Sequence, residues 1–457
     1  MSRIGKGGFP NHPEPRVTLT QRSWIPTSAK LPSCSQHKTI GAMMSASTPH
    51  LTELTSTTLP PKPGRFGKAN PAQSRSAFTL VELLAVIAIL GVLIGLMLPG
   101  LQYVREDARR TGCSNNFTQL GLALHNYHAA YNKFPYSRTV NDANWRGYSA
   151  IVGMLPYMEQ QEIWEMVSSR HTSDSGTHYE KYGGFPWTAD YTPNRIQIPA
   201  LRCPSDATET AAIGRLNYGF CYGDAARYIT YYWFHPDQNH PEEEHTWLGD
   251  PSVDRGMFTW NRRKQFRDCL DGTSQTMLMG EMATFQGDRS VIGTTAIFGT
   301  RDFQTDLQQC KDTVQPNRPQ FYKEDQTLAG MGRFSGQTNR GRWWMDPVSC
   351  NAAVNTILAP NQPSCTFSSE PGLDWYGGVY TVSSRHQGGA HILMTDGAIK
   401  FVTNTIDTAT DKMDSNTTVT QYGPGEGHSA GAESPFGVWG ALGTAASQEA
   451  RANSAAF

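Results

Sequence analysis

The longest predominantly apolar stretch of the chain runs from Phe78 to Leu98 and predicts a helix that can span a membrane. Its 21 residues would extend over about 30 Å as a helix, which matches the hydrocarbon thickness of a bilayer. Glu82 is the one charged residue in this stretch. Because an ionisable group inside a membrane span is costly without a partner, Glu82 is a candidate functional residue.

The helical pattern continues beyond Pro99 in an amphipathic form. One apolar stripe at spacings of three and four residues consists of Phe117, Leu120, Leu124, Tyr127 and Tyr131. Phe134-Pro135 ends the pattern. We therefore predict a single helix with a transmembrane half over residues 78–99 and a soluble amphipathic half over residues 100–133. Pro99 allows this helix to bend.

Residues 134–457 predict a β-rich head with long loops. Short strands are expected at 219–223, 276–281 and 296–300, a short helix at 155–167, and surface insertions at 233–256 and 303–350. Two apolar runs within 389–402 flank Asp396-Gly397, which predicts a hairpin with a two-residue loop. The Trp343-Trp344 pair is expected in the core. The predicted fold class is α+β, with a long N-terminal helix packed on this head.

The charge of the chain is distributed unevenly. Residues 1–77 carry a net charge of +8 and are rich in Pro, Ser, Thr and Gly, which predicts a disordered basic leader. The remainder carries −9, so the total of −1 does not indicate a nucleic-acid binder. A basic segment before an apolar one predicts a single-pass protein of the cytoplasmic membrane, with a cytoplasmic N-terminus and an extracytoplasmic head.

The chain has eight cysteines, none of them in a C-x-x-C pair. In an exported head, cysteines meet an oxidising compartment in which disulfides persist. Cys203 with Cys221 and Cys350 with Cys365 are the nearest neighbours in sequence. Spacing alone does not determine which cysteines pair.

The segment around Phe78 resembles the prepilin-type cleavage and methylation motif of type IV pilins and type II secretion pseudopilins. Phe78-Thr-Leu-Val-Glu82 carries the resemblance, with Ala77 where the family usually has Gly. The resemblance implies peptidase cleavage between Ala77 and Phe78, N-methylation of Phe78, and pairing of Glu82 with the Phe78 amine of a neighbouring subunit during assembly. Pro99 lies where many pilins carry a helix-bending proline. The implied partners are a prepilin peptidase, other pseudopilin subunits and membrane lipid.

Further landmarks resemble a large bacterial family of pseudopilin-like proteins with a domain of unknown function and a His-x9-Asp-Gly signature. The landmarks are "LRCPSD" (201–206), "NYG" (217–219), "DGTSQTMLMGE" (271–281), His386 before Asp396-Gly397, and "GVWGALGTAAS" (437–447). We expect structural roles for Cys203, Asp271, Gly272, His386, Asp396 and Gly397. Turn geometry explains the Asp-Gly pairs, hydrogen bonding or packing explains His386, and a disulfide or buried thiol explains Cys203.

The predicted function is that of a pseudopilin-like structural subunit, not an enzyme, with no cofactor and no metal. The main alternative is a tethered extracytoplasmic module that binds a glycan or a metal. Its candidate ligands are His235, His240 and His245, which lie among acidic residues in what reads as a solvated loop. His125 and His128 are expected on the polar side of the helix. A hydrolase ranks last and would need His386, Asp396 and a Ser or Cys in one cleft.

Overall fold

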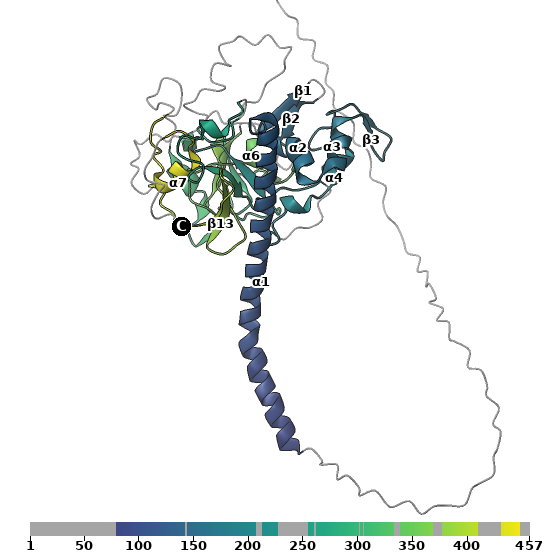
Figure 1. Cartoon of the computed structure of the whole chain (residues 1–457). Coiled ribbons are helices and arrows are strands. Elements are labelled where there is room, and N and C mark those ends of the chain that lie inside the picture. Colours follow the sequence, from purple (N-terminus) through teal and green to yellow (C-terminus); the bar gives the residue numbers. More distant parts are fainter. Residues whose placement is uncertain are drawn as a thin grey trace, which may run out of the picture. The chain divides into compact units, whose positions relative to one another are not determined.

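The computed structural model describes residues 79–141, 144–206, 213–226, 255–259, 262–300, 302–304, 306–332, 339–368, 377–409 and 431–447. The leader (1–77), the predicted cleavage site at Ala77 and Phe78, and the loop from His235 to His245 lie outside these residues. The described residues form the predicted α+β fold. One long helix runs into a β-rich head and projects beyond it (Figure 1).

The long helix, α1, spans Leu80–Tyr131 and has 52 residues. It begins with a capping box, in which the Thr79 hydroxyl accepts a hydrogen bond from the Glu82 amide and the Glu82 carboxylate accepts one from the Thr79 amide. It ends at Asn132, whose φ of 54° is left-handed, as is common at helix C-termini. The helix continues through Pro99, although a proline cannot donate a hydrogen bond to the preceding turn. Its projecting part is curved (Figure 1).

Among the described residues, α1 is the one helix long and apolar enough to cross a membrane, judged by length and composition. The other described residues do not cover its apolar N-terminal half, where Leu80 is 74% exposed and Leu96 is 72% exposed. The C-terminal half is different, because Phe117, Leu120 and Leu124 are fully buried against the head. The two predicted halves of the helix therefore differ in what surrounds them.

The central sheet of the head has five strands in the order β10-β5-β6-β13-β14. Their bounds are β10 Ala353–Val354, β5 Tyr218–Cys221, β6 Met277–Glu281, β13 Gly389–Met394 and β14 Ile399–Thr403. β10 pairs with β5 in parallel, and the other neighbours are antiparallel. The predicted strands at 219–223 and 276–281 are thus central strands.

The hairpin of β13 and β14 is confirmed, with Leu393 opposite Ile399. Its loop is longer than predicted. The Met394 amide donates to the Ala398 carbonyl (2.8 Å) and the Gly397 amide donates to the Met394 carbonyl (3.0 Å), which leaves residues 395–397 in the loop. Gly397 has a φ of 91°, the left-handed conformation that closes a three-residue hairpin loop. The prediction of a two-residue loop was therefore wrong.

The remaining elements surround this sheet. A three-stranded sheet has the order β12-β11-β7, with β12 Gly378–Val379, β11 Ser364–Phe367 and β7 Thr295–Phe298. Three small hairpins pair β1 Arg138–Asn141 with β2 Asn144–Ser149, β3 His171–Thr172 with β4 His178–Tyr179, and β8 Val314–Gln315 with β9 Arg318–Tyr322. The short helices are α2 Ala150–Met154, η1 Leu155–Met158, α3 Gln161–Ser168, α4 Thr192–Arg195, η2 Pro199–Leu201, η4 Phe266–Asp268, η5 Asp302–Gln304, α5 Leu307–Lys311, α6 Ser349–Ala352 and α7 Gly437–Gly443.

The C-terminal half of α1 packs directly on the central sheet. Phe117 meets Tyr218 of β5 edge-on, with ring centroids 4.7 Å apart. Gly121 lets the helix approach β13 closely, because a Cβ there would lie 3.2 Å from a methyl carbon of Leu393. This close packing fixes the helix against the strands that carry the residues described below.

The prediction that 303–350 is a surface insertion was wrong for part of the segment, since 316–320 are exposed and 344–350 are buried. Tyr322, Arg340 and Trp344 are all at most 1% exposed. The interior accommodates the polar residues of this segment because main-chain carbonyls bind them. The Arg340 guanidinium, for example, donates to the carbonyls of Ala353 (2.6 Å) and Thr381 (2.9 Å). A segment with weak hydrophobic periodicity can therefore still be core.

Candidate functional site

The loop 201–206, which carries the "LRCPSD" landmark, runs along α1 in the opposite direction and attaches the helix to the head. The contacting pairs are Glu106 with Ser205, Gly112 with Pro204, Cys113 with Cys203, and Asn116 with Arg202. The Asn116 amide donates to the Arg202 carbonyl (2.6 Å) and to the Tyr218 hydroxyl (2.9 Å). Asn116 thus binds both the loop and β5.

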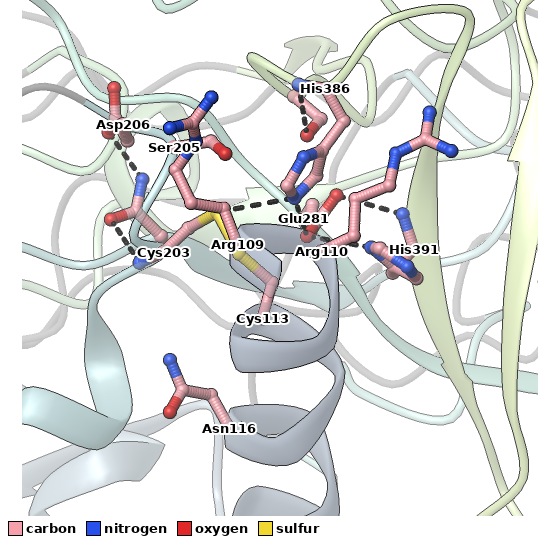
Figure 2. Close-up of polar contacts among 12 residues, drawn as sticks. Arg109, Arg110, Cys113, Asn116, Cys203, Ser205, Asp206, Glu281, His386 and His391 are labelled. Atoms are coloured by element: carbon pink, nitrogen blue, oxygen red, sulfur yellow. Dashed lines mark hydrogen bonds and ion pairs between the residues drawn. A yellow bond between two sulfur atoms is a disulfide. The ribbon is translucent and has the colours of Figure 1, made fainter. Parts of the chain in front are cut away.

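A buried disulfide joins Cys113 of α1 to Cys203 of this loop (Figure 2). A second disulfide joins Cys310 to Cys365 within the head. The other described cysteines, Cys221, Cys269 and Cys350, are buried and form no disulfide. The nearest neighbours in sequence therefore do not pair, because the fold brings together cysteines 90 and 55 residues apart. Only the first disulfide links the helix covalently to the head.

His386 lies directly beside this disulfide (Figure 2). It stands between the carboxylates of Glu106 and Glu281. Its Nδ1 atom is 2.6 Å from Oε1 of Glu106 on α1, and its Nε2 atom is 3.5 Å from Oε1 of Glu281 on β6. The His386 amide also donates to the Ser384 hydroxyl (3.2 Å). The side chain is buried, so it connects the helix to the sheet in the interior.

Glu281 is held by two further contacts from β13. Its Oε2 atom accepts from the His391 amide (2.8 Å), and its Oε1 atom lies 3.0 Å from His391 Nδ1. Burial alone would raise the pKa of Glu281, but the hydrogen bonds from His386 and His391 outweigh it and lower the pKa to about 2. Glu281 is therefore a buried carboxylate ion at neutral pH.

The two carboxylates also shift the pKa of His386. Burial would lower the pKa of His386, but Glu281 and then Glu106 outweigh it, so the pKa is raised above its usual value. Burial likewise opposes ionisation of Glu106, whose pKa is nevertheless lowered by His386 and Arg109. The result is a triad of ionisable groups, Glu106–His386–Glu281, which runs from α1 into the central sheet.

A second polar network anchors the far end of loop 201–206. Asp206 is 4% exposed and accepts hydrogen bonds from the Thr284 amide (2.9 Å) and from Arg385 Nε (3.3 Å). Asn217, from the "NYG" landmark, donates to Asp206 and accepts from the Cys203 amide (3.1 Å). These contacts hold Cys203 and the residue before His386 in place.

His125 and His128 also bind the head, so their predicted place on the polar side of the helix was wrong. His125 Nε2 lies 3.0 Å from the Thr395 carbonyl of the β13–β14 loop. His128 Nε2 accepts from the Phe266 amide (3.4 Å), and its ring packs on Phe266 at 4.3 Å. His128 follows Leu124 by four residues and therefore faces the same side of the helix.

The other signature residues lie at turns. Asp271 accepts from the Thr444 hydroxyl (3.1 Å) and the Ser447 amide (2.9 Å), which fixes the C-terminal segment after α7. Gly272 has a left-handed φ of 97°. Asp396 accepts from the Ala398 amide (2.9 Å) within the hairpin loop.

His386 precedes β13 and Asp396 follows it, so the two residues are at opposite ends of this strand. A strand of this length is about 16 Å long at about 3.3 Å per residue. Their polar partners also differ, since His386 contacts Glu106, Glu281, Cys203 and Ser384. The structure therefore does not bring together the residues that the hydrolase hypothesis combined.

A small cavity adjoins the charged triad and is lined by residues that include Cys203, Asp206, Glu281 and Arg385. Its volume of about 10 Å³ is room for about one water molecule. It does not fit a sugar. The alternative of a tethered glycan- or metal-binding module rests on His235, His240 and His245, which lie outside the described residues, so it stays a prediction.

Sequence reasoning missed Glu106, Glu281 and Asp206. Glu281 had a signal, because an acid at the end of the apolar strand "TMLMG" is costly unless it has a partner. Glu106 had none, since it stands in the run "REDARR", which reads as solvated helix surface.

The chain was compared with known proteins. A family described as a protein of unknown function (DUF1559) matches residues 102–409, and the prokaryotic N-terminal methylation motif matches residues 73–98. The first match covers the soluble half of α1, loop 201–206, His386 and the β13–β14 hairpin. No curated protein and no solved structure matches the chain.

Proposed function

The chain belongs to this DUF1559 family of proteins of unknown function and carries a prokaryotic N-terminal methylation motif, and from this premise we propose that it is a pseudopilin-like structural subunit. Its motif and apolar helix make it a pilin-like subunit of the kind that a prepilin peptidase processes. In the proposal, the subunit assembles through α1 in a type II secretion or pilus-like system. The head is structural rather than enzymatic.

The observation that carries this proposal is the uncovered apolar half of α1. Val81 is 73% exposed and Leu98 is 59% exposed, and the large apolar residues between them are similarly uncovered. Such a surface is not stable in water and needs lipid or other apolar helices around it. A membrane anchor that later packs against other subunits meets this need. The leader would remain cytoplasmic and the head extracytoplasmic.

Glu82 has two roles in the proposal. Within its own chain it completes the capping box with Thr79. After cleavage before Phe78, its carboxylate would also pair with the free amine of Phe78 on a neighbouring subunit. An opposite charge from that subunit would offset the cost of placing the carboxylate among apolar helices.

Cleavage is tested by mass spectrometry of the native N-terminus in cells with and without the prepilin peptidase. We expect a chain that begins at methylated Phe78 only when the peptidase is present. An intact leader in both strains would contradict the proposal and would leave an ordinary single-span anchor, for which the tethered binding module is the better hypothesis.

Assembly is tested by a matched pair of variants, Glu82→Gln and Thr79→Ala. Glutamine can still act in a capping box but carries no charge, whereas Thr79→Ala removes the cap and keeps the charge. We expect Glu82→Gln to abolish cross-linking between subunits in the membrane and Thr79→Ala to retain it. Equal cross-linking in both variants would show that charge pairing at Glu82 does not drive assembly.

A further inference from the structure

The cluster around the Cys113–Cys203 disulfide has the composition of a metal site. One ligand atom each from Cys113, Cys203, Glu281 and His386 lies within 4.8 Å of the others, and all four residues are buried. Two thiolates, an imidazole and a carboxylate are ligands that zinc binds in tetrahedral sites. We propose that these residues form a redox-gated site for one zinc ion, closed by the disulfide and opened when the disulfide is reduced.

Two of the distances between ligand atoms already suit zinc. His386 Nε2 is 3.5 Å from Cys203 Sγ and 3.5 Å from Glu281 Oε1. Tetrahedral zinc with ordinary bond lengths requires about 3.6 Å between sulfur and nitrogen ligands and about 3.3 Å between nitrogen and oxygen ligands. The atoms therefore need to move by only a few tenths of an ångström.

The two sulfur atoms must separate further, to about 3.8 Å in a tetrahedral zinc site. The Cα atoms of Cys113 and Cys203 are 5.0 Å apart, so rotation of the two side chains achieves this separation. A dithiol donates two electrons to the disulfide, becomes a disulfide itself and supplies two protons, which yields two thiols. Zinc then replaces the two thiol protons and any proton on Nε2 of His386.

The residues that bind the proposed ligands, rather than the ligands themselves, independently support a metal site. A histidine that binds metal donates its other ring N–H to a carboxylate in many sites, which fixes the ring and its tautomer. His386 has this arrangement, because Nδ1 is 2.6 Å from Glu106 and Nε2 points at the cluster. Glu281 is also oriented by hydrogen-bonding partners, the main-chain amide and the ring of His391.

The site would keep α1 attached to the head in both redox states. Cys113 belongs to the helix, whereas Cys203, Glu281 and His386 belong to the head. In the oxidised protein the disulfide makes this connection. In the reduced protein the zinc ion would make it through the same side chains.

The test uses the full chain with Cys34→Ser, purified in detergent, and Co²⁺ as the probe. A phosphine reduces the disulfides, taking one oxygen from water for each bond, and unlike a dithiol it does not chelate the metal strongly. We expect the reduced protein to bind one Co²⁺ with the absorption of a tetrahedral site and a thiolate-to-cobalt charge-transfer band. The oxidised protein should lack that band, because it has no thiolate in the cluster.

Three variants locate the ion. Cys113→Ser with Cys203→Ser should remove the charge-transfer band, whereas Cys310→Ser with Cys365→Ser, the matched control, should leave the band and the stoichiometry unchanged. Glu106→Gln should weaken cobalt affinity about 10- to 100-fold, as loss of such a supporting carboxylate does elsewhere. Histidines elsewhere in the chain give no thiolate band, so they are not confused with this site.

The Cys34→Ser chain without further substitutions can overturn the proposal by itself, even where another variant fails to fold. If the reduced chain shows no thiolate-to-cobalt band, the four residues do not form a metal site. If Cys113→Ser with Cys203→Ser keeps the band, the thiolates come from other cysteines and the proposal is equally wrong.

Discussion

The two halves of α1 have similar local structure and opposite surroundings. In the N-terminal half, leucines and isoleucines are exposed on every side, and Leu93, for example, is 51% exposed. In the C-terminal half, Leu120 is fully buried while Leu122, two residues away, is 61% exposed. The surface of the N-terminal half can contact any apolar partner, such as lipid or other apolar helices. The second half binds one head in one register.

Specificity in the second half comes from polar and covalent contacts added to packing. The disulfide at Cys113, the ion pair at Glu106 and the hydrogen bonds of Asn116 each require a fixed partner. Apolar contacts alone tolerate sliding by a turn, whereas these contacts do not. The comparison shows how one continuous helix can serve as an anchor at one end and as part of a folded domain at the other.

The largest expected effect comes from Cys113→Ser combined with Cys203→Ser. The cysteines are 90 residues apart, and the loss of a cross-link closing a loop of this length corresponds to about 4–5 kcal/mol of unfolding free energy. Urea denaturation measures this loss, and limited proteolysis of residues 106–134 reports release of the helix. Cys310→Ser with Cys365→Ser should also destabilise the head but leave that segment protected. Equal proteolysis in both variants would contradict a specific role for the first disulfide.

The next largest effect on stability distinguishes the buried face from the exposed face of the soluble half of α1. Leu120→Ala leaves a cavity between α1 and the sheet and should lower the free energy of unfolding by about 3 kcal/mol. Leu122→Ala, on the exposed face, should change it by less than about 0.5 kcal/mol. Chemical denaturation of both variants provides the comparison. A similar loss for both would mean that Leu122 is covered in the folded protein.

The triad predicts a pH dependence in the oxidised protein. Because the folded-state pKa of His386 is raised above 6.5, its contribution to stability is complete below pH 6.5 and is lost as the pH rises through the folded value. Glu281 has a pKa lowered from 4.5 to about 2, so its contribution is present above pH 4.5 and is lost as the pH falls towards 2. Denaturation between pH 5 and 9 should show a decline on the alkaline side that His386→Gln abolishes. An unchanged slope in that variant would exclude His386 as the cause.

The smallest expected effect on stability concerns the part of α1 between the predicted membrane span and the head. Val104 lies beyond the predicted membrane span and is 62% exposed. Val104→Ser should change the unfolding free energy of the isolated protein by less than about 0.5 kcal/mol. A larger change in thermal or chemical denaturation would show that a second subunit covers this stretch in the purified protein.

The features that the sequence predicted well are those determined by residues close together in the chain. Periodicity over consecutive turns predicts α1, and Asp396-Gly397 between two apolar runs predicts the hairpin. In each case the residues that form the pattern are only a few positions apart in the chain. Glu106 and His386 are 280 residues apart, and nothing in their immediate neighbourhoods marks them as partners. The same holds for Cys113 with Cys203. The segment 303–350 was misjudged because its buried polar residues are satisfied by distant main-chain groups.

The position of Cys113 has a mechanical consequence. The disulfide lies nearer the projecting end of α1 than Phe117, Leu120 and Leu124 do. Tension applied along the helix from its N-terminus therefore reaches a covalent bond before it reaches the apolar packing. The apolar contacts of Phe117, Leu120 and Leu124 are therefore protected from breaking one after another. A force on the N-terminal half of α1 is transmitted to the whole head through the disulfide.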